Sequence, residues 1–172
     1  MKLTPSQSKA IGYIEEFART TLTVGQSELP NVLAMSNILP SELDAATELL
    51  RKHARVALHF HPDRPSQTGK LVVEAMLQEG VYKNQFETHV SNGRLDPVAE
   101  GERARWENRM FGDVFATQAA KLRERPKYGA LDLMLHQDGP SPRFGSCYFL
   151  LSPEVSRRAT FSYMDSHREP IE

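Results

Sequence analysis

Residues 59–64, with the sequence HFHPDR, constrain the fold more than any other part of the chain. Pro62 fixes its own φ and disfavours helical geometry at His61, so a helix cannot continue through this point. The preceding sequence has a capping-box pattern at Ser41 and helical apolar spacing, so we expect an amphipathic helix from Glu42 to about Leu58. The six residues then hold two imidazoles, a carboxylate and a guanidinium on a short, stiff segment, as binding and catalytic sites do.

The bulk composition excludes several classes of protein. With 172 residues, the chain fits one compact domain or one domain with a small helical appendage. Its formal net charge of −1 gives no overall reason to bind nucleic acid or an anionic membrane, and we expect neither as a partner. No apolar run approaches the roughly 20 residues that cross a bilayer. The single cysteine, Cys147, excludes an internal disulfide, and its apolar neighbours predict a buried side chain.

The order of the predicted elements is helices first and strands later. An amphipathic helix is expected over residues 5–20, capped near Ser6 or Ser8, and Gly25, Pro30 and Pro40 break up residues 21–40. Further helical segments are expected at 71–79, ended by Gly80, and within 94–125, anchored by Trp106, Met110, Phe111 and Phe115. Strand-like runs are expected at 81–90, 128–135, 145–151 and 159–164. This order predicts an α+β fold, with a helical region at 1–58 and an α+β domain with an antiparallel sheet at 59–172.

Three interpretations of HFHPDR remain open at this stage. A metal site would need more ligands than the two histidines and one acid, and no cysteine cluster or helical histidine pair supports it, so we expect no metal. His61-Pro62-Asp63 also matches the tripeptide of J-domain co-chaperones, which sits in a loop after a basic helix. In the third interpretation, Arg64 binds a phosphate through its planar fork of donors, while His59 and His61 add donors or orient a ribose.

Two further groups of residues are candidates for a site. The segment 82–93 is too polar for a simple core strand. Glu87, beside Thr88, could act as an acid or base or stabilise a cationic sugar, and the alternative is a solvent-facing edge strand. Tyr128-Gly129 and Phe144-Gly145-Ser146 each place an aromatic ring beside a glycine that lets a backbone or a ligand approach closely. The ring could stack on a base or a nicotinamide ring, and core packing is the more common explanation. A cluster of basic residues is interpreted as a solvated helix face, with a basic patch as the alternative: Arg103, Arg105, Arg109, Lys121, Arg123, Arg125 and Lys127.

An ordered set of segments carries a family resemblance. They read HFHPDR, YKNQFETHVSNG, RWENRMFG, RPKYGALDLMLHQDGPSPRFGSCYFLLSPEV and ATFSYMDS. Together they resemble an uncharacterised bacterial protein family that includes the CteC-type effectors, mono-ADP-ribosyltransferases that modify threonine on ubiquitin. The resemblance covers about residues 45–166, and its longest piece is far more specific than the His-Pro-Asp tripeptide.

The resemblance implies an enzyme that binds NAD as co-substrate and transfers ADP-ribose to a protein hydroxyl, with ubiquitin as a possible acceptor. It implies synthesis in the bacterial cytoplasm and delivery to a host cell by a route that needs no signal peptide. The implied catalytic residues are Glu87, Arg64 and Ser91. The implied NAD-binding residues are His59, His61, Arg64, Gln85, Thr88, Ser91, Asn92, Gly93 and Tyr128.

The late strand that carries the key glutamate in ADP-ribosyltransferases is not evident in this sequence. We expect that the chain is a truncated piece of a longer protein with an incomplete sheet, or that Glu87 serves as the catalytic acid instead. The competing function is a co-chaperone or non-catalytic binding module that uses His61-Pro62-Asp63.

Overall fold

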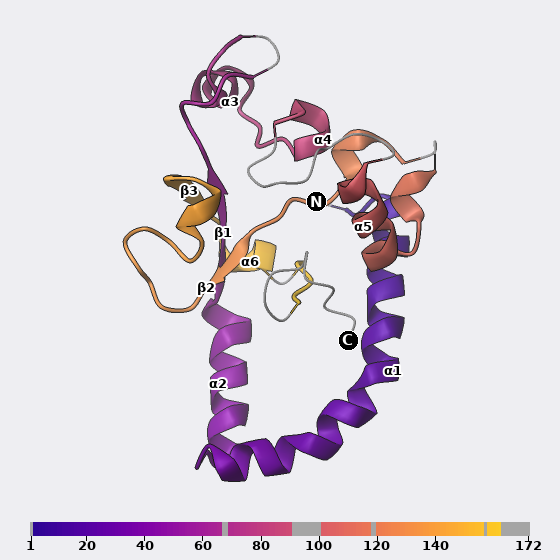
Figure 1. The fold of residues 1–172 in the computed structure, drawn as a ribbon. Helices are drawn as coiled ribbons and strands as arrows, with labels where there is room; N and C mark the ends of the chain where they lie inside the picture. The colour runs from indigo at the N-terminus through magenta and orange to yellow at the C-terminus, as the bar shows by residue number, and fades with distance from the viewer. Residues whose placement is uncertain (1, 67–68, 91–100, 118–119, 157, 163–172) are drawn as a thin grey trace.

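The computed structural model describes residues 2–66, 69–90, 101–117, 120–156 and 158–162 (Figure 1). Helices come first and a small three-stranded antiparallel sheet follows, so the predicted α+β class is confirmed. In chain order the elements are α1 (Pro5–Met35), α2 (Pro40–His53), β1 (Arg55–Phe60), α3 (Val72–Glu79), α4 (Gln85–Thr88), α5 (Glu102–Phe111), the 3-10 helices η1 (Val114–Ala116) and η2 (Leu122–Glu124), β2 (Ala130–Asp132), the 3-10 helix η3 (Pro142–Phe144), β3 (Cys147–Leu150) and α6 (Pro153–Ser156).

Helix α1 is twice as long as the sequence predicts. It begins at a capping box in which the hydroxyl of Thr4 accepts from the amide of Gln7 and the Gln7 side chain accepts from the amide of Thr4, so the predicted serine caps are wrong. The helix also continues through Gly25 and Pro30, which were predicted to interrupt it. Pro30 lacks the amide that would close a helical turn, and α1 curves along its length (Figure 1).

Helix α2 ends at His53, and the segment predicted as its last turn is instead strand β1. The predicted helix end near Leu58 is therefore wrong, and the predicted boundary between residues 58 and 59 lies inside β1. The cause is tertiary: five of the six β1 residues are buried, and the strand pairs on both sides. Pairing and burial of this kind override a local helical pattern. The cap also differs, because the Glu42 carboxylate accepts from the Leu39 amide and Ser41 is not the cap.

Strand β1 is the centre of the sheet, in the order β2-β1-β3 (Figure 1). It pairs antiparallel with β2, where Val56 faces Leu131, and with β3, where Leu58 faces Phe149. The predicted strand runs at 128–135 and 145–151 are thus confirmed in shorter form. Residues 159–162 are not in a strand, so that part of the fourth predicted strand is wrong, and residues 163–164 lie outside the described part of the chain.

Two glycines allow the backbones around β1 to approach closely. A Cβ atom on Gly129 would lie 2.6 Å from the carbonyl oxygen of Ala57. A Cβ atom on Gly145, whose φ is +150°, would lie 2.1 Å from the backbone carbonyl of Phe60. Of the two uses expected for these glycines, approach of a neighbouring backbone is the one the structure contains.

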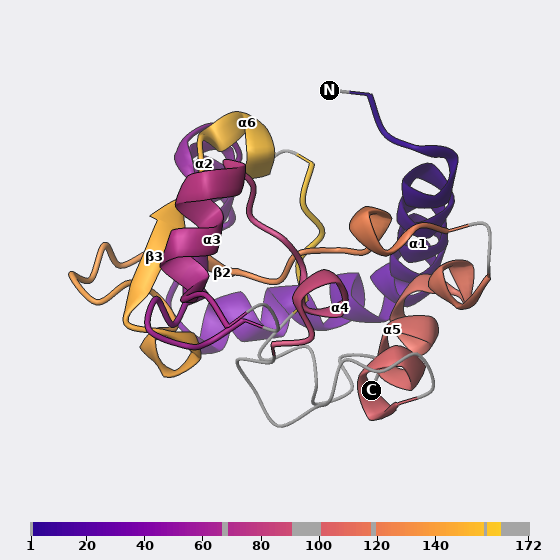
Figure 2. The ribbon, with the colours of Figure 1, turned by 90° about the horizontal axis from the view of Figure 1, so that it is seen from above.

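A second core forms where the start of α1 meets α5 and η1. Its centre is Ala10, Phe111, Val114 and Phe115, with Ile14 and Met110 packed against it. Trp106 is also buried, so the predicted aromatic anchors of this region are confirmed. Both views place α4 between α3 on one side and α5 on the other (Figures 1 and 2).

Three other predictions have clear outcomes. Helix α3 ends at Gly80 in a left-handed conformation, as predicted. The predicted strand at 81–90 is wrong, because residues 85–88 form the short helix α4. The predicted burial of Cys147 is also wrong, since its strand is at the edge of the sheet and its side chain is exposed. None of the described helices is long and apolar enough to cross a bilayer.

Candidate functional site

His59 closes the loop that precedes β3. Its Nδ1 atom lies 2.9 Å from the carbonyl oxygen of Gly145, and its Nε2 atom accepts from the amide of Ser141 at 3.2 Å. A neutral imidazole has one donor and one acceptor, so these two bonds specify the tautomer with hydrogen on Nδ1. The side chain is buried, and its ring packs against that of Tyr148 at a tilt of 34°. Both ring nitrogens therefore serve the loop, and neither is available to a dinucleotide.

The residues after His59 form a turn between β1 and α3. The carbonyl oxygens of Pro62 and Arg64 accept from the amides of Val73 and Val72, at the start of α3. His61 and Arg64 are half-buried, and Asp63 is exposed. The His-Pro-Asp tripeptide thus follows a buried strand, which differs from the position after a helix that the J-domain interpretation implies.

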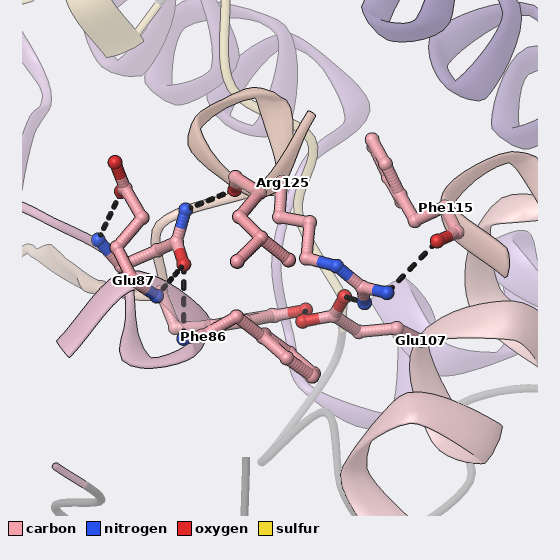
Figure 3. Close-up of polar contacts among 8 residues, drawn as sticks. Phe86, Glu87, Glu107, Phe115 and Arg125 are labelled. Carbon is pink, nitrogen blue, oxygen red and sulfur yellow. Dashed lines mark hydrogen bonds and ion pairs between the residues drawn. The ribbon is translucent and has the colours of Figure 1, made fainter. Parts of the chain in front are cut away.

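The short helix α4 carries Gln85, Glu87 and Thr88. The side-chain oxygen of Asn84 accepts from the amides of residues 86 and 87, and the Glu87 carboxylate accepts from the Asn84 amide at 2.9 Å. This capping box holds the Glu87 side chain in a half-buried position (Figure 3). The buried side-chain oxygen of Gln85 has no hydrogen-bond partner. Ser91, Asn92 and Gly93 lie outside the described residues.

Tyr82 connects this helix to the sheet. Its hydroxyl donates to the carbonyl oxygen of His59 at 3.1 Å, and its ring meets those of Phe60 and Phe149 edge-on. Burial raises the pKa of Tyr82 to about 12, because the phenolate would lose its hydration. The bond holds the segment just before α4 against the end of β1.

On its other side, α4 meets a buried ion pair. The Arg125 guanidinium lies 3.9 Å from the centre of the Phe86 ring and donates to the Glu107 carboxylate at 2.6 Å (Figure 3). A second nitrogen of Arg125 donates to the carbonyl oxygen of Phe115 at 2.8 Å. Glu107 is fully buried, and Asn84 donates to the Leu122 carbonyl nearby. These contacts join α4, α5, η1 and η2.

Tyr128 and Arg103 complete this group, which we call the Glu107 cluster: Arg103, Trp106, Glu107, Arg125 and Tyr128. The Tyr128 hydroxyl donates to the second Glu107 oxygen at 2.8 Å, and its ring lies 5.1 Å from that of Trp106. Burial raises the pKa of Glu107, against the hydrogen bonds of Tyr128 and Arg125, which lower it. Burial also raises the pKa of Tyr128, and the negative charge of Glu107 adds to that shift.

No sequence pattern joined these five residues, and Glu107 was not among the predicted ones. Arg103 and Arg125 belong to the basic group that was interpreted as a solvated helix face, yet both side chains are buried, so for these two that interpretation is wrong. The signal was present on one helix, where Trp106 and Glu107 follow Arg103 by three and four residues and so share its face. Arg125 could not be assigned in this way, because its partner is 18 residues away.

Three predicted segments are therefore connected in space. His59, at the start of the 59–64 segment, accepts a hydrogen bond from Tyr82, which lies just before α4. Phe86 of α4 contacts Arg125, and both Arg125 and Tyr128 donate to Glu107. Within the described ranges, no group of three or more histidine, cysteine or acidic side chains is placed to hold a metal ion. An open depression on α2, lined by residues 45, 48–49 and 51–53, contains none of these candidates.

The fold and the cluster define an α+β domain in which a short central strand and a buried charge cluster flank one helix. A family model described as a protein of unknown function (DUF3626) matches residues 55–172, beginning with β1. The chain belongs to this uncharacterised family, and α1 and α2 precede the matched region. No curated protein matches the chain, and no solved structure matches it.

Proposed function

We propose that this domain binds NAD and transfers ADP-ribose to a hydroxyl side chain, such as threonine, of a protein acceptor. The family resemblance to the CteC-type effectors suggests the reaction and suggests ubiquitin as the acceptor. One structural observation supports the choice of site: the 59–64 segment, α4 and Tyr128, which are distant in sequence, are linked by the Tyr82–His59 and Phe86–Arg125 contacts.

Arg64 is the proposed phosphate ligand. Its side chain is half-buried on the turn after β1, and the hydrogen bonds from Val72 and Val73 hold that turn against α3. A guanidinium keeps its charge and offers a planar pair of donors to a phosphate. His61 is half-buried on the same turn and can add a donor, whereas His59 is excluded by its two bonds to the loop.

Glu87 is the proposed catalytic carboxylate. In the proposed reaction, the bond between nicotinamide and C1′ of the ribose breaks, and neutral nicotinamide leaves with the bonding electrons. The cation that remains resembles the oxocarbenium ion of glycoside hydrolysis, which a nearby carboxylate stabilises. The acceptor oxygen then bonds to C1′ and gives up its proton, which the Glu87 carboxylate accepts. The capping box supports this role, because it fixes the position of the Glu87 side chain through the Asn84 amide.

Binding is tested first, by calorimetric titration of NAD into the chain and into Arg64→Ala. We expect the variant to bind about 10- to 100-fold more weakly, since a lost hydrogen bond to a charged group costs roughly 1.5–3 kcal/mol. Arg51→Ala is the matched control, because Arg51 is an exposed arginine on α2 that pairs only locally with Glu48. Equal affinity of Arg64→Ala and the unmodified chain would remove Arg64 from the site.

Transfer is tested with Glu87→Gln. Glutamine also accepts a hydrogen bond at this position of a capping box, so α4 should remain folded. We expect NAD affinity to be kept and release of nicotinamide in the presence of ubiquitin to fall by about 100-fold or more. Mass spectrometry of ubiquitin would locate the modified residue. Full transfer activity in Glu87→Gln would refute the catalytic assignment, and no NAD binding by the unmodified chain would refute the proposed function.

A further inference from the structure

The Glu107 cluster contains two buried arginines with very different surroundings. Arg125 lies 3.9 Å from the Phe86 ring, and two of its nitrogens donate to Glu107 and Phe115. Arg103 is also buried, at 8% exposure, but it lies 5.9 Å from the Trp106 ring centre and 5.7 Å from that of Tyr128. Its buried Nε atom has no hydrogen-bond partner. Aromatic rings attract a cation, but they do not accept its hydrogen bonds as an oxygen does.

The positive and negative charges of the cluster also do not balance. Two guanidinium groups share one carboxylate, and both oxygens of Glu107 already accept hydrogen bonds, one from Arg125 and one from Tyr128. Arg103 interacts with Glu107 through charge alone. The cluster therefore carries at least one excess positive charge, whichever protonation state Glu107 has. An excess buried charge is costly unless a counter-ion with hydrogen-bonding oxygens accompanies it.

The position of Arg103 favours an anion as that counter-ion. Arg103 is in the first turn of α5, a ten-residue helix whose N-cap, Gly101, provides no side-chain cap. The positive charge of Arg103 and the positive end of the helix dipole therefore add at the start of α5. A single oxyanion could accept hydrogen bonds from both.

We propose that Arg103, at the start of α5, binds an oxyanion of the phosphate type. Such a ligand supplies the oxygen acceptor that Nε lacks and neutralises the excess charge of the cluster. Its source is either the diphosphate of a dinucleotide or a free phosphate. The site does not depend on the proposed function, since it follows from the partners of Arg103 alone.

The test is calorimetric titration of inorganic phosphate into the full chain, with ionic strength held constant by sodium chloride. We expect saturable binding that is about 10- to 100-fold weaker in Arg103→Lys, because lysine keeps the charge but loses the planar fork and Nε. Arg105→Lys is the matched control, since Arg105 is an exposed arginine on the same helix. Thermal melting of each variant without phosphate identifies any loss of folding.

Two results would overturn the site: no phosphate binding by the folded, unmodified chain, or equal binding by the unmodified chain and a folded Arg103→Lys variant. A repeat of the titration in the presence of NAD separates the two sources of ligand. If Arg103-dependent phosphate binding is lost, the site holds the dinucleotide diphosphate. If it is kept, the site stands as a separate phosphate site, even where NAD binding itself fails and the proposed function falls.

Discussion

Two buried polar groups hold this fold in different ways. At the sheet, neutral His59 bonds to the backbone at Ser141 and Gly145 and keeps the loop before β3 in place. Between the helices, the side-chain oxygens of buried Glu107 accept from Arg125 and Tyr128. The first arrangement uses directional hydrogen bonds to backbone groups, and the second relies on interactions between buried charged side chains. The loop at the sheet should therefore tolerate loss of its polar group better than the helical region does.

The largest effect is expected from Glu107→Ala. Removing the carboxylate leaves Arg125 and Arg103 buried without their shared counter-ion, and breaking a buried pair from one side costs about 3–5 kcal/mol of unfolding free energy. Urea denaturation would measure this loss. The matched control is Glu48→Ala, which breaks the exposed pair with Arg51 and should change stability by less than about 1 kcal/mol. Equal costs for the two variants would contradict a buried electrostatic role.

The next effect is expected from Gly145→Ala, which tests how closely the loop approaches β1. The added Cβ would meet the Phe60 backbone at 2.1 Å in a conformation with φ of +150°, so we expect a loss of about 3 kcal/mol or more. Gly80→Ala separates the steric contact from the cost of a positive φ. Gly80 also has a positive φ, +65°, but nothing lies within 4 Å of its added Cβ. That control should lose only about 1 kcal/mol. A similar loss in both variants would mean that the contact with Phe60 contributes little.

Local sequence patterns predict some features of this fold and fail for others. Helix α3 and its end at Gly80 follow from local patterns, and so do the aromatic anchors of α5. Strand β1 was missed because its apolar residues continue the spacing of α2, and only pairing with segments more than 70 residues away makes it a strand. Helix α4 was missed because the alternating polarity of its segment predicts a strand, although Asn84 and Glu87 form a capping box. Local signals failed at β1, where distant pairing competed with them, and at α1 and α4, where one local pattern outweighed another.

A moderate effect is expected from His59→Leu. The substitution fills the same position with an apolar side chain but leaves the Ser141 amide and the Gly145 carbonyl without their partner, at a cost of about 1–3 kcal/mol. Hydrogen exchange should show that the loss concentrates in residues 139–146, while the amides of α5 keep their protection. Leu58→Met, a substitution of similar volume in the same strand, is the control for packing alone. Uniform loss of protection across both regions would mean that the two do not respond separately.

The smallest effect at neutral pH is expected from Tyr82→Phe, which removes one hydrogen bond to the His59 carbonyl and about 1 kcal/mol of stability. In alkali this difference shrinks and then reverses, because phenylalanine has no hydroxyl to ionise. The folded pKa of Tyr82, about 12, is above the ordinary value of 10.0, so between these values the unfolded chain releases the proton that the folded chain keeps. Stability contributed by Tyr82 is therefore complete below pH 10 and is lost as the pH rises toward 12. The pKa of Tyr128 is raised as well, so Tyr82→Phe should reduce the alkaline loss without abolishing it. Urea denaturation of both proteins between pH 8 and 12 would measure the difference, and parallel curves would show that burial does not raise the pKa of Tyr82 in the folded chain.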